Sequence, residues 1–193
     1  MYFIVFLSTV LVLIWARFSY FRIDSVGAKK VSRLYDPIVT IHIALSLYYS
    51  AITEQESTRI EIIAISFCLL GFFLFLWSLY TAKKLNFAGS DSTFSLIVRG
   101  PYSLIRHPFY LAYSLIWTSS TLLFNSYILW ITLVLLVAFY IFSAKREEKA
   151  ILEGKYSREY RNYVIDVGMF LPRVTQWKSW FFEQSRTVKR KKK

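Results

Sequence analysis

The residues best suited to chemistry lie in one short segment that contains two prolines. The segment holds a glycine, two prolines, two tyrosines, an arginine and a histidine: Gly100, Pro101, Tyr102, Arg106, His107, Pro108 and Tyr110. Each proline removes a backbone donor and disfavours helix at the residue before it, and glycine permits conformations that other residues resist. We predict a shaped turn that presents groups able to hold an anion, exchange a proton or face a cation. Pro108 is expected to start the next helix.

Two adjacent acids, Glu147 and Glu148, follow an apolar segment and stand among basic residues. In one interpretation they open a solvated helix, where Glu–Lys pairs are worth about 0.2–0.5 kcal/mol each. In the other, one carboxylate turns inward to accept hydrogen bonds from a polar ligand. Downstream, Tyr156, Tyr160 and Tyr163 have spacings that place them on one helix face. We expect that face to pack over the proline-rich loop or on lipid headgroups.

The composition excludes a small soluble domain. Of 193 residues, 55% are hydrophobic and 19% aromatic, and the mean hydropathy is +0.40. That is more apolar surface than one small core can bury, and the aromatic content also excludes disorder. Cys68 is the single cysteine, so an intramolecular disulfide is impossible and no metal site is predicted.

The apolar segments predict the fold. A span needs about 20 mostly apolar residues to cross about 30 Å of hydrocarbon. Five segments approach this: 1–16, 37–52, 60–82, 109–124 and 126–144. We therefore predict an all-α, multi-pass integral membrane bundle of about five helices, forming one domain over 1–193. Asn125 and Ser126 are expected to form a tight turn between the last two spans. The first segment lacks the basic start and small-residue cleavage site of a signal peptide, which favours a retained span.

The distribution of basic residues predicts the orientation. All Lys and Arg residues except Arg59 fall in the loop 17–36, the loop 83–108 or the segment 145–193. Five spans place these three regions on one side, and basic loops favour the cytosol. We expect an outside N-terminus and a cytosolic C-terminus, in either a bacterial inner membrane or the endoplasmic reticulum.

The C-terminal part is expected to comprise a cytosolic or interfacial helical segment, 145–185, and a basic tail, 186–193. The tail suits anionic headgroups, although its lysine spacing also fits an endoplasmic-reticulum retrieval signal. The membrane bilayer is therefore the expected partner. Nucleic acid is not, because the charge is spread along one membrane face.

The two polar clusters together resemble the isoprenylcysteine carboxyl methyltransferase and phospholipid methyltransferase superfamily. Residues 100–110 match its Gly-Pro-Tyr-x-x-x-Arg-His-Pro-x-Tyr motif, and 147–152 is similar to its Glu-Glu-x-x-Leu stretch. The resemblance extends from about Lys83 to Arg173. Ala112 stands where the family often has glycine, and the spacing leaves either acid as the functional one.

The resemblance implies S-adenosyl-L-methionine as methyl donor. It implies catalytic roles for Arg106, His107 and Glu148. The implied cofactor-binding set is Gly100, Pro101, Tyr102, Arg106, His107, Pro108, Tyr110, Glu147 and Glu148. In this interpretation the arginine pairs with the cofactor carboxylate, an acid accepts from its ammonium or ribose, and tyrosine rings face the sulfonium. The expected acceptor is an isoprenylated cysteine carboxylate or a similar lipid-like molecule, with a phosphatidylethanolamine-type amine as the alternative.

Other functions remain open from sequence. A sterol-type NADPH reductase shares a similar Arg-His-Pro-x-Tyr element, but usually has asparagine where this chain has Phe109. A non-enzymatic membrane scaffold is the third possibility. His42 and the polar run 118–121 would either line an acceptor tunnel or bond neighbouring helices to one another. The oligomeric state is not predicted.

Overall fold

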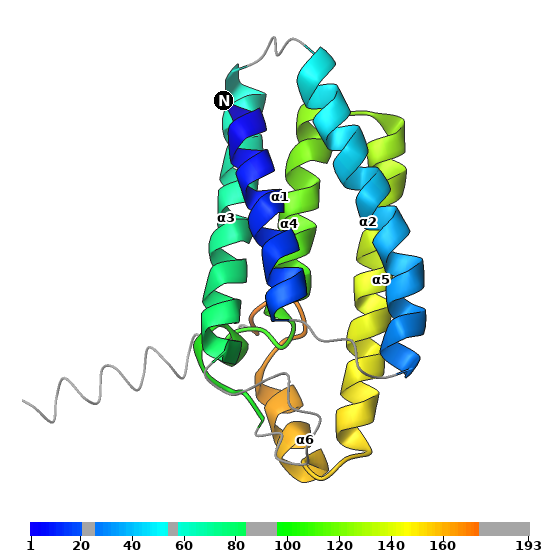
Figure 1. The fold of residues 1–193 in the computed structure, drawn as a ribbon. Helices are drawn as coiled ribbons and strands as arrows, with labels where there is room; N and C mark the ends of the chain where they lie inside the picture. Colours follow the sequence, from blue (N-terminus) through cyan, green and yellow to red (C-terminus); the bar gives the residue numbers. More distant parts are fainter. Residues whose placement is uncertain (21–25, 54–57, 84–95, 174–193) are drawn as a thin grey trace, which may run out of the picture.

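Five long helices run side by side and alternate in direction along the chain (Figure 1). They are α1 (Tyr2–Ser19), α2 (Val26–Ile52), α3 (Thr58–Lys83), α4 (Pro108–Phe124) and α5 (Tyr127–Leu152). A 3-10 turn, η1 (Gly100–Ser103), precedes α4, and the short helix α6 (Ser157–Asp166) follows α5. This computed structural model describes residues 1–20, 26–53, 58–83 and 96–173. These residues contain no β-strand, so the predicted all-α fold is confirmed.

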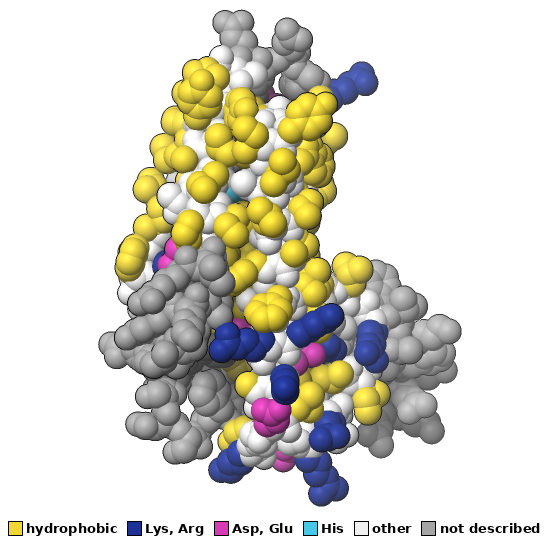
Figure 2. Space-filling view, turned by 90° about the vertical axis from the view of Figure 1, so that its right-hand side faces the viewer, with side chains coloured by type: hydrophobic (Ala, Val, Ile, Leu, Met, Phe, Trp, Pro, Cys, Tyr) yellow, Lys and Arg dark blue, Asp and Glu magenta, His cyan; other side chains and the backbone are white. Residues whose placement is uncertain are grey.

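The bundle has the surface of a membrane protein. Three helical stretches in the described residues are long and apolar enough to cross a bilayer: Tyr2–Ser19, Thr58–Ala82 and Tyr127–Leu152. On the face in Figure 2, hydrophobic side chains cover the length of the bundle, and Lys and Arg gather around its lower end. The predicted integral membrane helical bundle is confirmed. The number of five spans stays a prediction, because α4 has only 17 residues and α2 carries charges in its first turns.

Two helices differ from the predicted spans in where they begin or end. α2 begins at Val26, ahead of the expected start at 37, and Pro37 lies inside it. α5 continues past 144 to Leu152, because no Gly or Pro interrupts it before Gly154. Both glutamates of the acidic pair therefore belong to the same helix as the last apolar segment. The predicted basic tail, and positions 84–95 of the predicted motif loop, lie outside the described residues.

A close contact between α3 and α4 depends on Gly71. A Cβ atom at this position would lie 2.7 Å from the carbonyl oxygen of Ala112 and 2.8 Å from Cγ1 of Ile116. Ala112 is fully buried in this contact. Small residues let membrane helices approach closely, and here Gly71 provides the space on one side while alanine is accommodated on the other.

We expect Gly71→Val to separate α3 from α4 and lower the free energy of unfolding. Overpacking of this kind costs about 1–3 kcal/mol, and the slightly better helix propensity of valine does not offset it. Thermal unfolding of the detergent-purified protein measures the effect. An unchanged melting temperature would contradict the close packing described above.

Side-chain hydrogen bonds connect the helices inside the bundle. His42 of α2 forms two hydrogen bonds with neighbouring helices. Its Nδ1 lies 2.8 Å from the hydroxyl of Thr132 in α5, and its Nε2 lies 3.1 Å from the hydroxyl of Ser120 in α4. The hydroxyl groups of Tyr2 and Ser119 lie 2.8 Å apart and connect α1 to α4. These contacts support the interpretation of His42, Ser119 and Ser120 as links between helices. Thr118 and Thr121 of the polar run donate instead to carbonyls of their own helix.

Candidate active site

The proline-rich loop is a tight turn held against the end of α3. Gly100 has φ +60°, and a Cβ atom there would lie 2.6 Å from Oγ1 of Thr81. The carbonyl of Pro101 accepts from the backbone N–H of Leu104 at 3.1 Å and of Ile105 at 3.0 Å. The predicted shaped turn is confirmed. Two features require glycine at position 100: the positive φ and the close approach of the backbone to α3.

The turn places Arg106 and His107 directly before the start of α4. Pro108 is the first residue of α4, as predicted. Its lack of a backbone N–H loses no hydrogen bond there, because the first N–H groups of a helix have no partner within the helix. At the other end, Asn125 ends α4 in a left-handed conformation with φ 45°, and α5 begins two residues later. This confirms the predicted tight turn. The resulting hairpin brings the start of α4 beside the last turns of α5.

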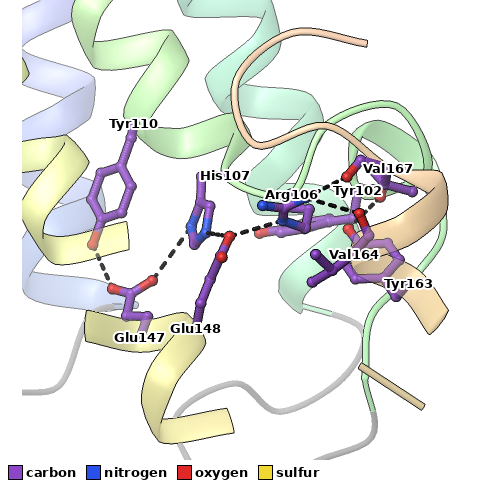
Figure 3. A network of polar contacts seen from close by, with 9 residues as sticks. All are labelled: Tyr102, Arg106, His107, Tyr110, Glu147, Glu148, Tyr163, Val164 and Val167. Atoms are coloured by element: carbon purple, nitrogen blue, oxygen red, sulfur yellow. Dashed lines mark hydrogen bonds and ion pairs between the residues drawn. The ribbon is translucent and has the colours of Figure 1, made fainter. Parts of the chain in front are cut away.

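Glu148 of α5 joins the arginine and the histidine (Figure 3). Its Oε1 atom accepts from Nε of Arg106 at 2.8 Å and lies 3.0 Å from Nε2 of His107. The side chains are 13%, 6% and 8% exposed, respectively. A guanidinium buried this far from water needs a paired, hydrogen-bonded anion. Glu148 therefore compensates the charge of two buried side chains.

Glu147 contacts the same histidine from the solvent side. Its side chain is 54% exposed, its Oε1 accepts from the hydroxyl of Tyr110, and its Oε2 lies 3.6 Å from Nδ1 of His107. Sequence left open which acid is functional. The structure brings both to the histidine but gives them different environments: Glu148 is enclosed by protein, whereas Glu147 remains accessible to a ligand.

The segment after α6 closes over Arg106. Nη1 of Arg106 donates to the carbonyls of Val164 and Val167. The backbone N–H of Arg106 donates to the Gly168 carbonyl at 2.9 Å, and that of His107 to the Met169 carbonyl at 3.1 Å. Sequence reasoning missed these partners, because a carbonyl acceptor carries no sequence signal. The available signal was Gly168, because a glycine can mark a position where the backbone packs closely, and the sequence analysis did not use it.

Tyr163, one tyrosine of the predicted aromatic face, links α6 to the loop. Tyr160 and Tyr163 are buried, and Tyr156 lies just ahead of the helix. The hydroxyl of Tyr163 donates to the backbone carbonyl of Tyr102 at 2.5 Å. The expectation that this face packs over the proline-rich loop is confirmed.

A stack of rings extends from the acidic pair into the bundle. Tyr110 is stacked between His107, with ring centroids 5.7 Å apart, and Tyr140, at 5.3 Å. The hydroxyl of Tyr140 bonds the Tyr35 hydroxyl at 2.9 Å and accepts from Nε1 of Trp117 at 2.8 Å. The exposed carboxylate of Glu147 therefore stands at the edge of a rigid stack of aromatic rings, where it can attract a cationic group.

The environment of His107 favours its protonated form. Burial lowers the pKa of His107, but hydrogen bonds and charge from Glu147 and Glu148 outweigh it, so the pKa lies above its ordinary value of 6.5. Protonation gives both ring nitrogens a hydrogen to donate, one toward each carboxylate.

We expect the stability of the protein to fall as the pH rises above about 6.5. The folded state binds the proton of His107 more tightly than the unfolded state. This contribution is therefore complete below the unfolded pKa and is lost as the pH passes the folded pKa. Melting temperatures of the wild type and of His107→Gln across about pH 5 to 8 measure it. A difference between the two proteins that did not change with pH would contradict the prediction.

The predicted site residues separate into two groups. Arg106, His107, Tyr110, Glu147 and Glu148 converge on one cluster. The others shape the backbone that carries this cluster: Gly100, Pro101, Tyr102 and Pro108. Gly100 faces Thr81 of α3, and the Tyr102 hydroxyl is buried without a hydrogen-bond partner among the described residues.

The chain matches a known protein family over its central part. The family model described as Phospholipid methyltransferase matches residues 60–159. That range contains α4, α5 and all nine predicted site residues, whereas the carbonyls of Val164, Val167 and Gly168 lie beyond it. No curated protein matches the chain.

Proposed function

Because the chain belongs to the phospholipid methyltransferase family and is an integral membrane methyltransferase, we propose that it uses S-adenosyl-L-methionine to methylate a lipid-like acceptor. The observation that carries this proposal is the cluster of two glutamates, His107 and Arg106 inside the matched region. It combines an accessible carboxylate with the stack of aromatic rings, and both lie at the end of the bundle that carries α6 (Figure 3).

The residues present fit the proposed cofactor. When bound, it supplies a methyl group on a positively charged sulfur. The half-exposed carboxylate of Glu147 can accept hydrogen bonds from an ammonium or from ribose hydroxyls. The hydroxyl of Tyr110 donates to this carboxylate and so orients it toward a bound ligand. These two residues are the ones we assign to cofactor binding.

Arg106 takes a positioning role in this proposal. Its Nε and Nη1 atoms already donate to Glu148, Val164 and Val167, and its side chain is 6% exposed. We infer that it holds the segment after α6 against the start of α4 and so completes the wall of the site. The contact between Arg106 and the cofactor carboxylate expected from sequence stays a prediction.

The accessible acid favours an amine acceptor. Glu147 would attract the ammonium of a phosphatidylethanolamine-type lipid and repel the carboxylate of an isoprenylated cysteine. An amine acceptor would have to lose a proton before it could accept the methyl group that the cofactor would supply. Because Glu147 is assigned to the cofactor, that proton would pass to solvent water rather than to this carboxylate. A carboxylate acceptor needs no such proton loss and remains the second candidate.

The charge distribution supports a cytosolic site. Lys and Arg gather at the end of the bundle that carries the acidic pair and α6 (Figure 2). Basic segments favour the cytosolic side, so we propose that the N-terminus lies outside and the site faces the cytosol. The cofactor would then arrive from water, and the apolar part of the acceptor would enter from the bilayer.

Binding of labelled S-adenosyl-L-methionine to the detergent-purified protein tests the proposal, with NADPH as competitor. We expect binding that NADPH does not displace. Loss of a charge-assisted contact in Glu147→Gln should weaken it about 10- to 100-fold. Glu153→Gln serves as the control, since Glu153 is an exposed acid one turn after Lys149 and outside the cluster. Displacement by NADPH would indicate a reductase, and binding of neither nucleotide by folded protein would indicate a scaffold.

A matched pair of acceptors then distinguishes the two candidates. A farnesylated cysteine and phosphatidylethanolamine are each incubated with the labelled cofactor in detergent. We expect the label in the phospholipid. The newly formed bond should be stable to mild base, because an N-methyl group is stable to mild base whereas a methyl ester is hydrolysed. Base-labile label in the prenylated cysteine would instead establish the carboxylate acceptor.

A further inference from the structure

A small pocket opens on the outer face of α3, away from the acidic pair. It has a volume of about 180 Å³ and is lined by Trp77, Tyr80, Thr81, Arg99 and Gly100. Pockets for whole small molecules measure about 300–1,000 Å³, so this one suits a single compact group. Three of its residues belong to the last turns of α3, and the other two begin the proline-rich loop.

The pocket lies where a membrane–water boundary is expected. The side chains of Trp77 and Tyr80 are 46% and 62% exposed on the outside of an apolar helix. Such tryptophan and tyrosine side chains concentrate at the headgroup level of a bilayer. α3 ends at Lys83, so the pocket occupies the end of the span rather than its centre.

Two of the polar groups that line the pocket, those of Arg99 and Trp77, can only donate hydrogen bonds. Arg99 is exposed and brings a guanidinium, whose planar set of N–H groups matches phosphate oxygens. The indole N–H of Trp77 has no hydrogen-bond partner in the part of the chain that the structure describes. Among the residues that the structure describes, no acidic residue lines the pocket. A compact anion is therefore the ligand that these groups favour.

We propose that this pocket binds the phosphate group of a membrane phospholipid in the leaflet adjoining α6. The recognised chemistry is a phosphate anion. A lipid supplies it better than free phosphate does, because the pocket opens between aromatic side chains on the bilayer-facing surface. The inference does not depend on methyl transfer, since none of these contacts involves Glu147, Glu148 or His107.

A bound headgroup would also hold the loop that leads to the acidic cluster. Gly100 lines the pocket and sits directly against Thr81. Two residues later, the backbone carbonyl of Tyr102 accepts a hydrogen bond from the hydroxyl of Tyr163 in α6. A phosphate held by Arg99 would press this loop onto α3 from its outer side.

Lipid titration followed by native mass spectrometry tests the proposal on the full chain in detergent. The probes are phosphatidylglycerol, diacylglycerol with the same acyl chains, and inorganic phosphate. We expect phosphatidylglycerol to bind, diacylglycerol to bind more weakly, and inorganic phosphate not to displace the lipid. Arg99→Gln should weaken phosphatidylglycerol binding about fivefold, the effect of one interfacial basic residue. Trp77→Phe, which keeps a ring but loses the indole N–H, should weaken it less.

Arg158→Gln is the matched control. Arg158 is exposed on α6, outside the pocket, and its substitution removes the same charge as Arg99→Gln does. Phosphatidylglycerol binding should be unchanged in this variant. Equal losses in the two arginine variants would overturn the proposal in favour of general surface attraction. If diacylglycerol bound as tightly as phosphatidylglycerol, or if inorganic phosphate displaced the lipid, the assignment of a phospholipid phosphate would be overturned.

Discussion

Glu148→Gln should unfold the end of the bundle that carries α6 and abolish cofactor binding. The substitution removes the anion that compensates Arg106 and His107, whose side chains are 6% and 8% exposed. Breaking a buried ion pair by removing one partner costs about 3–5 kcal/mol, because the remaining charge is left uncompensated. Denaturant unfolding in mixed micelles measures the change in free energy of unfolding, and labelled S-adenosyl-L-methionine measures binding.

Glu153→Gln separates this effect from simple loss of a glutamate on the same helix end. Glu153 pairs with Lys149 at 3.9 Å, with side chains 67% and 78% exposed. Exposed pairs of this kind contribute about 0–1 kcal/mol. Equal losses in the two variants would show that Glu148 does not hold the cluster together.

Gly168→Ala should detach the segment after α6 from the start of α4. A Cβ atom on residue 168 would lie 1.9 Å from the carbonyl oxygen of Leu171, so the backbone must move. That movement breaks the hydrogen bonds from the backbone N–H groups of Arg106 and His107 to Gly168 and Met169. We expect a loss of about 1–3 kcal/mol in the free energy of unfolding. Cofactor binding should be lost as well, because Arg106 and His107 lose their alignment.

Gly154→Ala is the matched glycine control. Its added Cβ would lie 3.4 Å from the carbonyl oxygens of Ala150 and Ile151, a distance that needs little rearrangement. Unfolding and cofactor binding are measured as for Gly168→Ala, together with far-ultraviolet circular dichroism to show that the helices remain. If Gly168→Ala bound the cofactor as Gly154→Ala does, the segment after α6 would have no part in shaping the site.

Much of the architecture was predictable because it depends on local composition. The apolar segments located all five long helices, Pro108 located the start of α4, and Asn125 located the turn before α5. The start of α2 was not predictable in this way. Pro37 suggested a boundary, yet helical residues lie on both sides of it. Proline biases only its own neighbourhood, and membrane helices tolerate a proline where other groups satisfy the freed carbonyl.

The residue types of the site were likewise present in two short motifs, and their resemblance to a known family indicated methyl transfer. What sequence alone could not decide was the role of each group. It suggested Arg106 as a ligand for the cofactor, whereas its contacts are with Glu148, 42 residues away, and with carbonyls of Val164 in α6 and Val167 just after it. It could not choose between Glu147 and Glu148, because adjacent helical residues differ only in the direction that their side chains face.

The sequence by itself therefore determined the membrane class, the helices and the chemical groups available. The tertiary structure alone decided which acid is buried as a counter-ion and which is exposed, and it placed Gly168 and its neighbouring carbonyls over Arg106. The physical reason is that helix formation and membrane partitioning depend on nearby residues, whereas charge pairing in a buried cluster depends on distances between helices far apart in the chain.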